Sequence, residues 1–220
     1  MAYIDFISAI HKSTKRDYLA RVNEFPKAEA ARIAKRFDKD YWDGDRKVGY
    51  GGYKYDGRWL PVAQAMAKHY GLKAGDRVLD VGCGKGFLLY EFTLAVPGIE
   101  VVGIDLSSYA IEHAHEPVKP FLRVANANAL PFPDKSFDLV FSITTLHNLK
   151  CYDLEKALKE IERVGRGAKH IVVESYRTEE EKVNLLYWQL TCESFYGPDE
   201  WEWWFKRSGY TGDHSLIYFE

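Results

Sequence analysis

The chain has 220 residues, of which 46% are hydrophobic and 28% are charged. Its 30 basic and 32 acidic residues give a formal net charge of −2, so no global positive field attracts nucleic acid, and we expect neither duplex DNA nor bulk RNA as a partner. No run of 18 apolar residues and no secretory leader occurs, which predicts no membrane span and a cytoplasmic location.

The length suits a single α/β domain, and the cysteines give no sign of cross-linking. Three cysteines, Cys83, Cys151 and Cys192, form an odd set without a C-x-x-C pair. This pattern predicts free thiols, no disulfide framework and no metal site.

The first 59 residues form a distinct N-terminal unit in composition. Residues 1–37 are charged, with helical spacing of apolar residues around Ala31 and an interruption at Pro26, which predicts two short helices. Residues 38–59 then show no period, and the 19 residues from Tyr41 to Trp59 hold five glycines among large rings. A long loop of this kind is typical of a lid, so we expect residues 38–59 to close over a site built by residues 60–220.

From residue 60 onward, helical and extended patterns alternate, which predicts an α/β fold with a doubly wound, mostly parallel sheet. Strands are expected at 77–81, 100–104, 121–125, 137–143 and 170–174, and helices at 61–70, 86–93, 107–115, 154–164 and 198–208. Residues 178–196 read as an insertion, and 210–219 as one extended stretch.

The most informative segment is Val78–Gly86, VLDVGCGKG, a buried strand that runs into a glycine-rich turn. Alternate glycines allow a sharp turn and close approach of the backbone to a ligand, and the helix that follows offers free N–H groups. A dinucleotide fingerprint, G-x-G-x-x-G, needs glycine where Phe87 stands, so the pattern is D-x-G-x-G-x-G. Asp105 ends the second strand 19 residues beyond Gly86, a spacing suited to binding ribose hydroxyls.

These segments resemble class I S-adenosylmethionine-dependent methyltransferases. Two more segments, 126–133 and 136–148, are similar to the family's third-strand loop and fourth strand, although Asn126 stands where the family usually has Asp. The resemblance implies a Rossmann-like fold, S-adenosylmethionine as cofactor and a small-molecule acceptor. It implies that the cofactor contacts are Asp80, Gly82, Gly84, Gly86, Asp105, Leu106, Asn126 and Ala127.

The acceptor side is predicted from position alone. His147 follows the fourth strand, where the methyl group would be presented, and histidine suits proton removal at neutral pH, although a core role is equally open. Substrate contacts are expected from Tyr53, Arg58, Asn148, Tyr176 and Arg177. An ion pair at a helix start is the alternative for Arg177.

Two functions from different classes stay open. The first is methylation of an oxygen or nitrogen atom on a small molecule, with an anionic or nucleotide-activated metabolite suggested by basic residues such as Arg46, Lys47 and Lys54. The second is a regulatory module that binds S-adenosylmethionine or its product without turnover. A nicotinamide-dependent dehydrogenase is disfavoured by the missing glycine at Phe87. The oligomeric state does not follow from the sequence.

Overall fold

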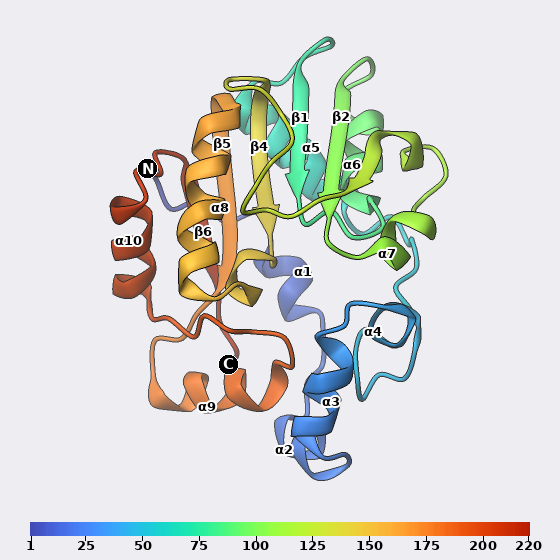
Figure 1. Cartoon of the computed structure of the whole chain (residues 1–220), viewed down its shortest axis with the longest axis vertical. Helices are drawn as coiled ribbons and strands as arrows, with labels where there is room; N and C mark the ends of the chain where they lie inside the picture. The colour runs from blue at the N-terminus through green and yellow to red at the C-terminus, as the bar shows by residue number, and fades with distance from the viewer.

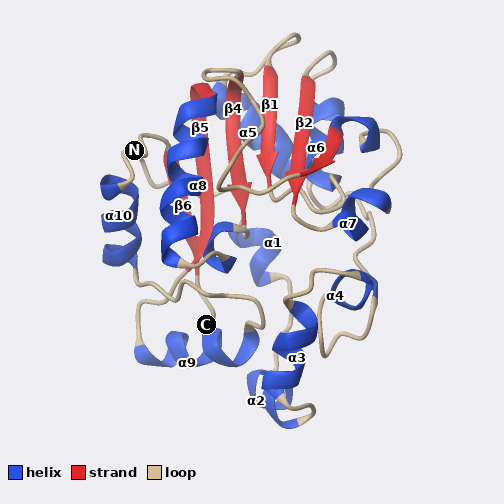
Figure 2. Cartoon of the chain, in the orientation of Figure 1, coloured by secondary structure: helices blue, strands red, loops and turns tan.

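A single parallel sheet forms the middle layer of the molecule, between two layers of helices (Figure 1, Figure 2). The computed structural model describes all 220 residues. The strands are β1 (Arg77–Val81), β2 (Glu100–Asp105), β3 (Leu122–Val124), β4 (Phe137–Ile143), β5 (Gly165–Glu174) and β6 (Asp213–Ile217). They lie in the order β3-β2-β1-β4-β5-β6 and every neighbouring pair is parallel, which confirms the predicted doubly wound fold.

The helices fall into an N-terminal group and a group that flanks the sheet. The N-terminal group is α1 (Ser8–Lys12), α2 (Tyr18–Asn23), α3 (Lys27–Ala34) and α4 (Lys39–Asp43). The others are α5 (Leu60–Tyr70), α6 (Phe87–Ala95), α7 (Ser108–Glu112), α8 (Cys151–Val164), α9 (Glu179–Trp188) and α10 (Pro198–Arg207), with 3₁₀ turns at Lys119–Phe121 and Leu146–Asn148.

The two faces of the sheet are covered by different helices because successive strand residues point to opposite sides. Val78 belongs to a cluster of buried residues that includes Met66 of α5 and Phe92 of α6. Leu79 belongs to a second cluster with Leu158 of α8 and Trp201 of α10. Burial on both sides explains why the central strands are almost continuous apolar runs.

The carboxyl ends of the strands all meet one edge of the sheet, the lower edge in Figure 1, where α1, α4 and α9 lie. Strand β1 has β2 on one side and β4 on the other, so the loops after β1 and β4 leave in different directions. Such a switch point opens a crevice for ligands in doubly wound folds. The N-terminal helices thus lie over the place where a ligand is expected.

The N-terminal unit contains four short helices where the sequence predicts two, and α4 lies inside the predicted loop. Another helix, α9, fills part of the predicted insertion. Side chains at the N-caps hold three of these helices: Asp17 accepts from Ala20 N, Asp38 from Asp40 N, and Thr178 from Glu181 N. Helices of five to ten residues carry little periodic signal, which is why the apolar pattern did not indicate them.

Two strands differ from the prediction in detail. Strand β5 begins at Gly165 rather than His170, since Gly165 pairs with Phe137 through the backbone and needs no apolar side chain. The C-terminal extended stretch forms one strand, β6, which runs parallel to β5. Its outer edge is partly covered by the N-terminal residues, where Ile4 N donates to His214 O at 2.9 Å.

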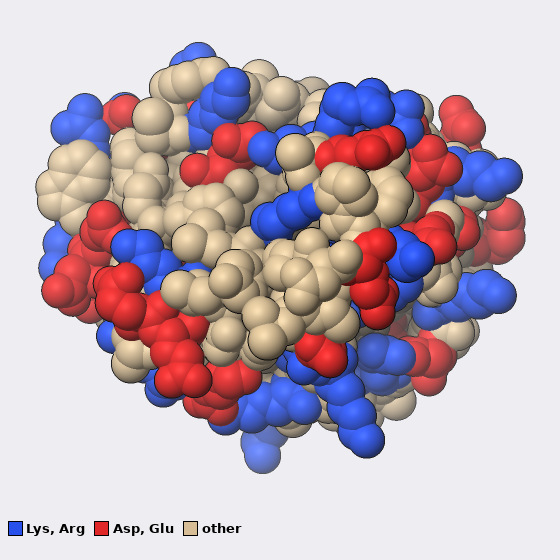
Figure 3. All heavy atoms as spheres, turned by 90° about the horizontal axis from the view of Figure 1, so that it is seen from below, with Lys and Arg blue, Asp and Glu red and all other residues tan.

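Charge is distributed over the surface without a dominant sign. Figure 3 shows basic and acidic side chains mixed over the lower end of the molecule. None of the helices has the length and apolar character needed to cross a bilayer. Cys83, Cys151 and Cys192 are all unpaired, as the sequence predicts.

Candidate functional site

The glycine turn after β1 is shaped for close approach. Gly82, Gly84 and Gly86 have φ values of 91°, 53° and 77°, in the region that disfavours side chains. A Cβ added at Gly82 would lie 2.1 Å from Thr145 Oγ1, and one at Gly84 would lie 2.9 Å from a ring carbon of Trp42. The turn therefore leaves no room for any residue other than glycine at either place.

Two acidic side chains lie beside this turn without a cationic partner. Asp105 accepts from Gly84 N and Ser107 N, both at 2.8 Å, through different carboxylate oxygens. Asp80 is 5% exposed, and burial together with the charge of Asp105 raises the pKa of its carboxyl well above the usual value. Burial also raises the pKa of Asp105. A ligand with a positive charge and hydrogen-bond donors would stabilise the ionised form of both carboxyls.

A cavity of about 180 Å³ lies over the turn, and most of the predicted cofactor residues line it. They are Asp80, Gly82, Gly84, Asp105, Leu106, Asn126 and Ala127. Gly86 lies outside the cavity, because it ends the turn at the start of α6, where a Cβ would meet Leu122 Cδ1 at 2.7 Å. We call this space the cofactor cavity, since its donor and acceptor groups suit a cationic nucleoside such as S-adenosylmethionine.

The remaining walls of the cofactor cavity come from residues 38–59, which we call the lid. Trp42 is 6% exposed and its Nε1 donates to Ser107 Oγ at 2.9 Å. The next residue, Asp43, accepts from Lys85 Nζ at 2.7 Å and from Tyr109 OH at 2.9 Å. These hydrogen bonds hold the lid against the glycine turn. Lys85, which no sequence motif indicated, provides one of them.

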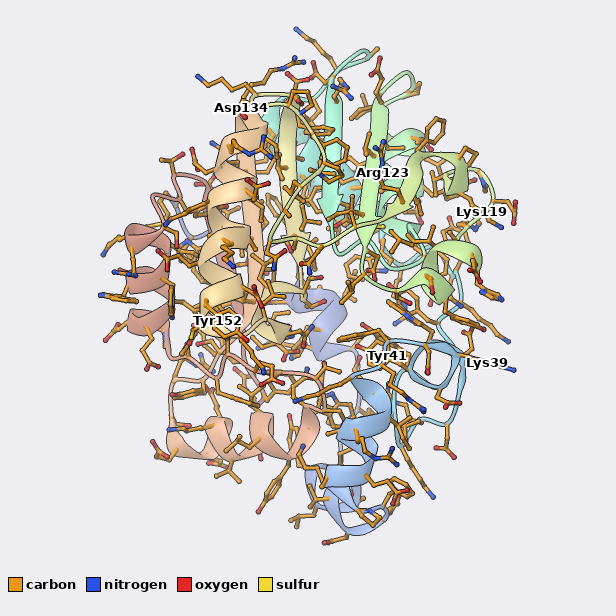
Figure 4. The ribbon with its side chains drawn as sticks, in the orientation of Figure 1. Lys39, Tyr41, Lys119, Arg123, Asp134 and Tyr152 are labelled. Carbon is orange, nitrogen blue, oxygen red and sulfur yellow. The ribbon has the colours of Figure 1, made fainter.

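Aromatic rings of the lid fill the space above the turn. Tyr53 stacks on Phe87 with ring centroids 4.9 Å apart, and Trp42 stacks on Tyr50 at 5.4 Å. Tyr41 lies between the N-terminal helices and the lower edge of the sheet, whereas Lys39 of the same helix points outward (Figure 4). Tyr41, Trp42, Tyr50 and Tyr53 thus form the lid side of the cofactor cavity wall.

A second, larger cavity of about 410 Å³ adjoins the first, and we call it the acceptor cavity. The two share the wall residues Tyr41, Tyr50, Tyr53, Trp59, Thr144 and Asn148. Of the predicted acceptor-side residues, Tyr53, Arg58, Asn148 and His147 line this cavity. Among the basic residues suggested by the sequence, Arg46 and Lys54 line it, and Lys47 does not.

Tyr176 and Arg177 do not reach either cavity, although the sequence places them there. The chain turns away after β5, since Ser175 Oγ donates to Tyr196 O at 2.9 Å. Arg177 pairs with Glu181 and Glu220, and its guanidinium lies 4.1 Å from the centre of the Tyr218 ring. Arg177 therefore forms an ion pair at the start of α9, which was the alternative to substrate binding.

His147 is buried against an acidic residue that ends β5. Its Nε2 lies 3.3 Å from Glu174 Oε2, and its Nδ1 accepts from Glu174 N at 3.4 Å. Burial lowers the pKa of His147 to about 3 and raises that of Glu174 to about 8. At neutral pH the imidazole is therefore neutral, with both ring nitrogens directed at Glu174 rather than at the cavity.

Glu174 is the functional candidate that the sequence analysis missed. It lies in the acceptor cavity wall, and the one protein group near its buried Oε2 is His147 Nε2, at 3.3 Å. Two buried atoms on the same wall lack partners, Arg16 Nε and Asn148 Oδ1. Strand alternation could have pointed to Glu174, because Val173 faces the α8 side and its successor must face the other way.

Known methyltransferases are similar to this chain in sequence. Residues 79–173 match the family model described as a methyltransferase domain. A demethylmenaquinone methyltransferase of Tropheryma whipplei is 33% identical over 147 residues, which cover 65% of this chain and 58% of that protein. A 27-O-demethylrifamycin SV methyltransferase of Amycolatopsis mediterranei is 35% identical over 106 residues, covering 44% of this chain and 39% of that protein.

Solved structures agree with this relationship. The YcgJ protein of Bacillus subtilis superimposes with a TM-score of 0.54 and 25% identity, covering 66% of each chain. The chain spans less than two thirds of the length of the curated relatives described above. The matched family segment holds the glycine turn, strands β2 to β4 and most of β1 and β5, whereas β6 and the lid lie outside it.

Proposed function

The chain belongs to the class I S-adenosylmethionine-dependent methyltransferases, and we propose that it methylates a small molecule bound in the acceptor cavity. When bound, S-adenosylmethionine supplies a methyl group that its positively charged sulfur activates. The residues that would hold it are Asp80, Asp105 and Asn126, with the backbone of Gly82–Gly84.

The observation that carries this proposal is the shared wall of the two cavities. Methyl transfer is an in-line displacement that needs the nucleophile about 3 to 3.5 Å from the methyl carbon and little water between them. Thr144 directly after β4, Asn148 in the 3₁₀ turn that follows, and the lid rings Tyr50 and Tyr53 border both spaces. A cofactor on one side and an acceptor on the other would meet at this wall.

The acceptor cavity also has the polar groups that a substrate needs. Arg16 Nε and Asn148 Oδ1 are buried without partners. Leaving each group unpaired costs about 1 to 3 kcal/mol, which a bound substrate with donors and acceptors would recover. A module that binds only the cofactor has no use for this second cavity, so we favour the enzyme over the regulatory alternative.

We further propose that the acceptor atom is an oxygen or nitrogen whose proton passes to Glu174. The carboxyl of Glu174 lies in the cavity wall, where it could accept a hydrogen bond from the substrate, and His147 Nε2, 3.3 Å from Glu174 Oε2, holds the carboxyl in place. His147 thereby acts through Glu174, in place of direct proton removal. The 27-O-demethylrifamycin SV methyltransferase is named for an oxygen position, and a further relative, the ubiquinone/menaquinone biosynthesis C-methyltransferase of Hahella chejuensis, is named for carbon, so the acceptor atom needs direct measurement.

The test is methyl transfer from labelled S-adenosylmethionine to a panel of small hydroxyl, amine and quinol compounds. We expect labelled product with at least one compound, and calorimetric binding of S-adenosylmethionine and S-adenosylhomocysteine. Tight binding of both without transfer to any compound would favour the regulatory module. Binding of NADH in their place would contradict the family's cofactor.

A further inference from the structure

Three arginines converge on one tryptophan at the edge of the acceptor cavity. The guanidinium carbons of Arg16, Arg21 and Arg46 lie 5.4, 5.2 and 5.3 Å from the centre of the Trp188 ring. They come from separate segments, the α1–α2 connection, α2 and the lid. All four residues line the acceptor cavity and none lines the cofactor cavity.

No carboxylate neutralises these arginines. None of them takes part in any ion pair of the protein, whereas Arg58 in the same wall pairs with Asp56. Main-chain oxygens hold them instead: Arg16 Nη1 donates to His11 O at 3.1 Å, and Arg46 Nη1 donates to Tyr50 O at 3.2 Å. Arg16 Nε is buried with no partner at all. Main-chain hydrogen bonds therefore hold the three arginines in place, and at least one guanidinium N–H group has no acceptor.

The accumulated positive charge is itself unfavourable. Burial and the charge of Arg46 lower the pKa of both Arg16 and Arg21. Nearby, burial and the charge of Arg21 lower the pKa of Lys27 to about 8. The charge of Glu174 opposes the lowering of the pKa of Arg16, but burial raises the pKa of Glu174 itself to about 8, so this carboxyl is mostly neutral at pH 7. A purely structural cluster would be more stable with a carboxylate among the arginines.

We propose that Arg16, Arg21 and Arg46 bind an oxyanion, either a carboxylate or a phosphate, carried by the methyl acceptor. Guanidinium groups match the oxygen geometry of both anions and form charge-assisted hydrogen bonds with them. The proposal rests on the proposed function and narrows its substrate class. Part of the remaining wall is apolar or aromatic, as at Ile10, Trp59 and Phe219, and this part would contact an apolar portion of the acceptor.

Binding of small probes to the full chain tests the subsite without requiring turnover. The probes are 4-hydroxybenzoate, phenyl phosphate and the neutral 4-hydroxybenzamide, titrated by calorimetry in the presence of S-adenosylhomocysteine. We expect at least one anion to bind about tenfold or more tightly than the amide, and high salt to reduce that difference. The better anion identifies whether the subsite takes a carboxylate or a phosphate.

Single variants then assign the binding to the arginines. Arg16→Gln, Arg21→Gln and Arg46→Gln are each expected to weaken the better anion by about 10- to 100-fold and to leave S-adenosylhomocysteine binding unchanged. The matched control is Arg32→Gln, an exposed arginine of α3 without an ion pair and outside the cavity, which should change neither.

Two results would overturn the subsite: equal binding of the anions and the amide by the parent chain, or equal losses in Arg32→Gln and the cluster variants. The parent comparison decides even where a variant does not fold. Methyl transfer to neutral acceptors alone would contradict the subsite and leave the proposed function intact. Tight anion binding without any methyl transfer would contradict the proposed function and leave the subsite intact.

Discussion

Asp105 uses both carboxylate oxygens to hold the glycine turn and still faces the cofactor cavity. We predict that Asp105→Ala weakens S-adenosylmethionine binding about 10- to 100-fold, because a hydrogen bond to a charged group contributes about 1.5 to 3 kcal/mol. Calorimetry measures this change. Asp134→Ala, which removes an exposed carboxylate paired with Arg163, is the control and should have no effect. Equal affinities of parent and Asp105→Ala would exclude a cofactor role for Asp105.

Glu174 is expected to set the pH dependence of turnover. A base must be ionised to accept a proton, and burial raises the pKa of Glu174 to about 8, so kcat should rise with pH up to about 8. His147, whose pKa burial lowers to about 3, should add no ionisation near pH 6 to 7. We predict that Glu174→Gln lowers kcat by about 10²- to 10⁴-fold and removes the ionisation near 8.

Stability against pH gives the control for that variant. Because the folded-state pKa of Glu174 is raised above its unfolded value, its contribution to stability is complete at low pH and is lost as pH rises through about 8. Denaturant unfolding of Glu174→Gln should therefore lack this loss between about pH 5 and 8. A folded Glu174→Gln enzyme with near-parental kcat would remove Glu174 from proton transfer and leave it a structural role.

The sequence could predict site residues that belong to a local pattern and could not predict those that meet only in three dimensions. The glycines, Asp80 and Asp105 follow from one strand–turn–helix–strand unit. Arg177 was placed by position along the chain, yet Glu181, only four residues further on, provides a nearer partner. Arg46 was expected near the acceptor only as one of several basic residues, and Arg16 gave no signal, since their convergence on Trp188 depends on contacts between residues far apart in the chain.

Among the elements, the lid is held against the glycine turn in part by the ion pair between Asp43 and the buried Lys85. Asp43→Ala would leave Lys85, whose side chain is 7% exposed, without its carboxylate partner. We predict that this variant opens the lid and speeds tryptic cleavage at Lys47, Lys54 and Arg58 about tenfold, since an unpaired buried charge costs about 1 to 3 kcal/mol or more. Gel analysis or mass spectrometry measures the cleavage.

Asp45→Ala is the matched lid control, because the side chain of Asp45 accepts a hydrogen bond only from Lys47 N, within the loop. Cofactor and acceptor together should slow cleavage of the parent chain, as closure buries the same bonds. Equal rates for Asp43→Ala, Asp45→Ala and the parent would show that the Asp43–Lys85 pair does not hold the lid.

Helices and strands could be predicted where their burial requires a regular pattern of apolar residues in the sequence. The central strands β1 and β4 are buried on both faces, so their apolar runs gave their bounds directly. The four helices of residues 8–43 are short and lie over the sheet edge, where contacts with distant segments decide their positions. His11 shows this, because its Nε2 contacts Tyr218 O at 3.0 Å, from the opposite end of the chain.

At the scale of the whole molecule, both cavities draw their walls from distant parts of the chain. The acceptor cavity includes Ile7 near the N-terminus and Phe219 near the C-terminus, and the cofactor cavity joins the lid to the sheet. A ligand in either space contacts segments that separate on unfolding. Ligand binding should therefore stabilise the chain as a unit rather than only the loop that it touches.

Thermal unfolding can measure this coupling. At a concentration 100 times its Kd, a ligand that binds only the folded chain adds about 2.7 kcal/mol to the free energy of unfolding. For a chain of this size each kcal/mol raises Tm by about 2 to 4 °C, so S-adenosylmethionine should raise Tm by roughly 5 to 10 °C. Asp105→Ala should show a much smaller rise at the same ligand concentration, and NADH should give none. A shift with NADH in place of S-adenosylmethionine would mean that the glycine turn binds a dinucleotide, despite Phe87 at the position that its fingerprint reserves for glycine.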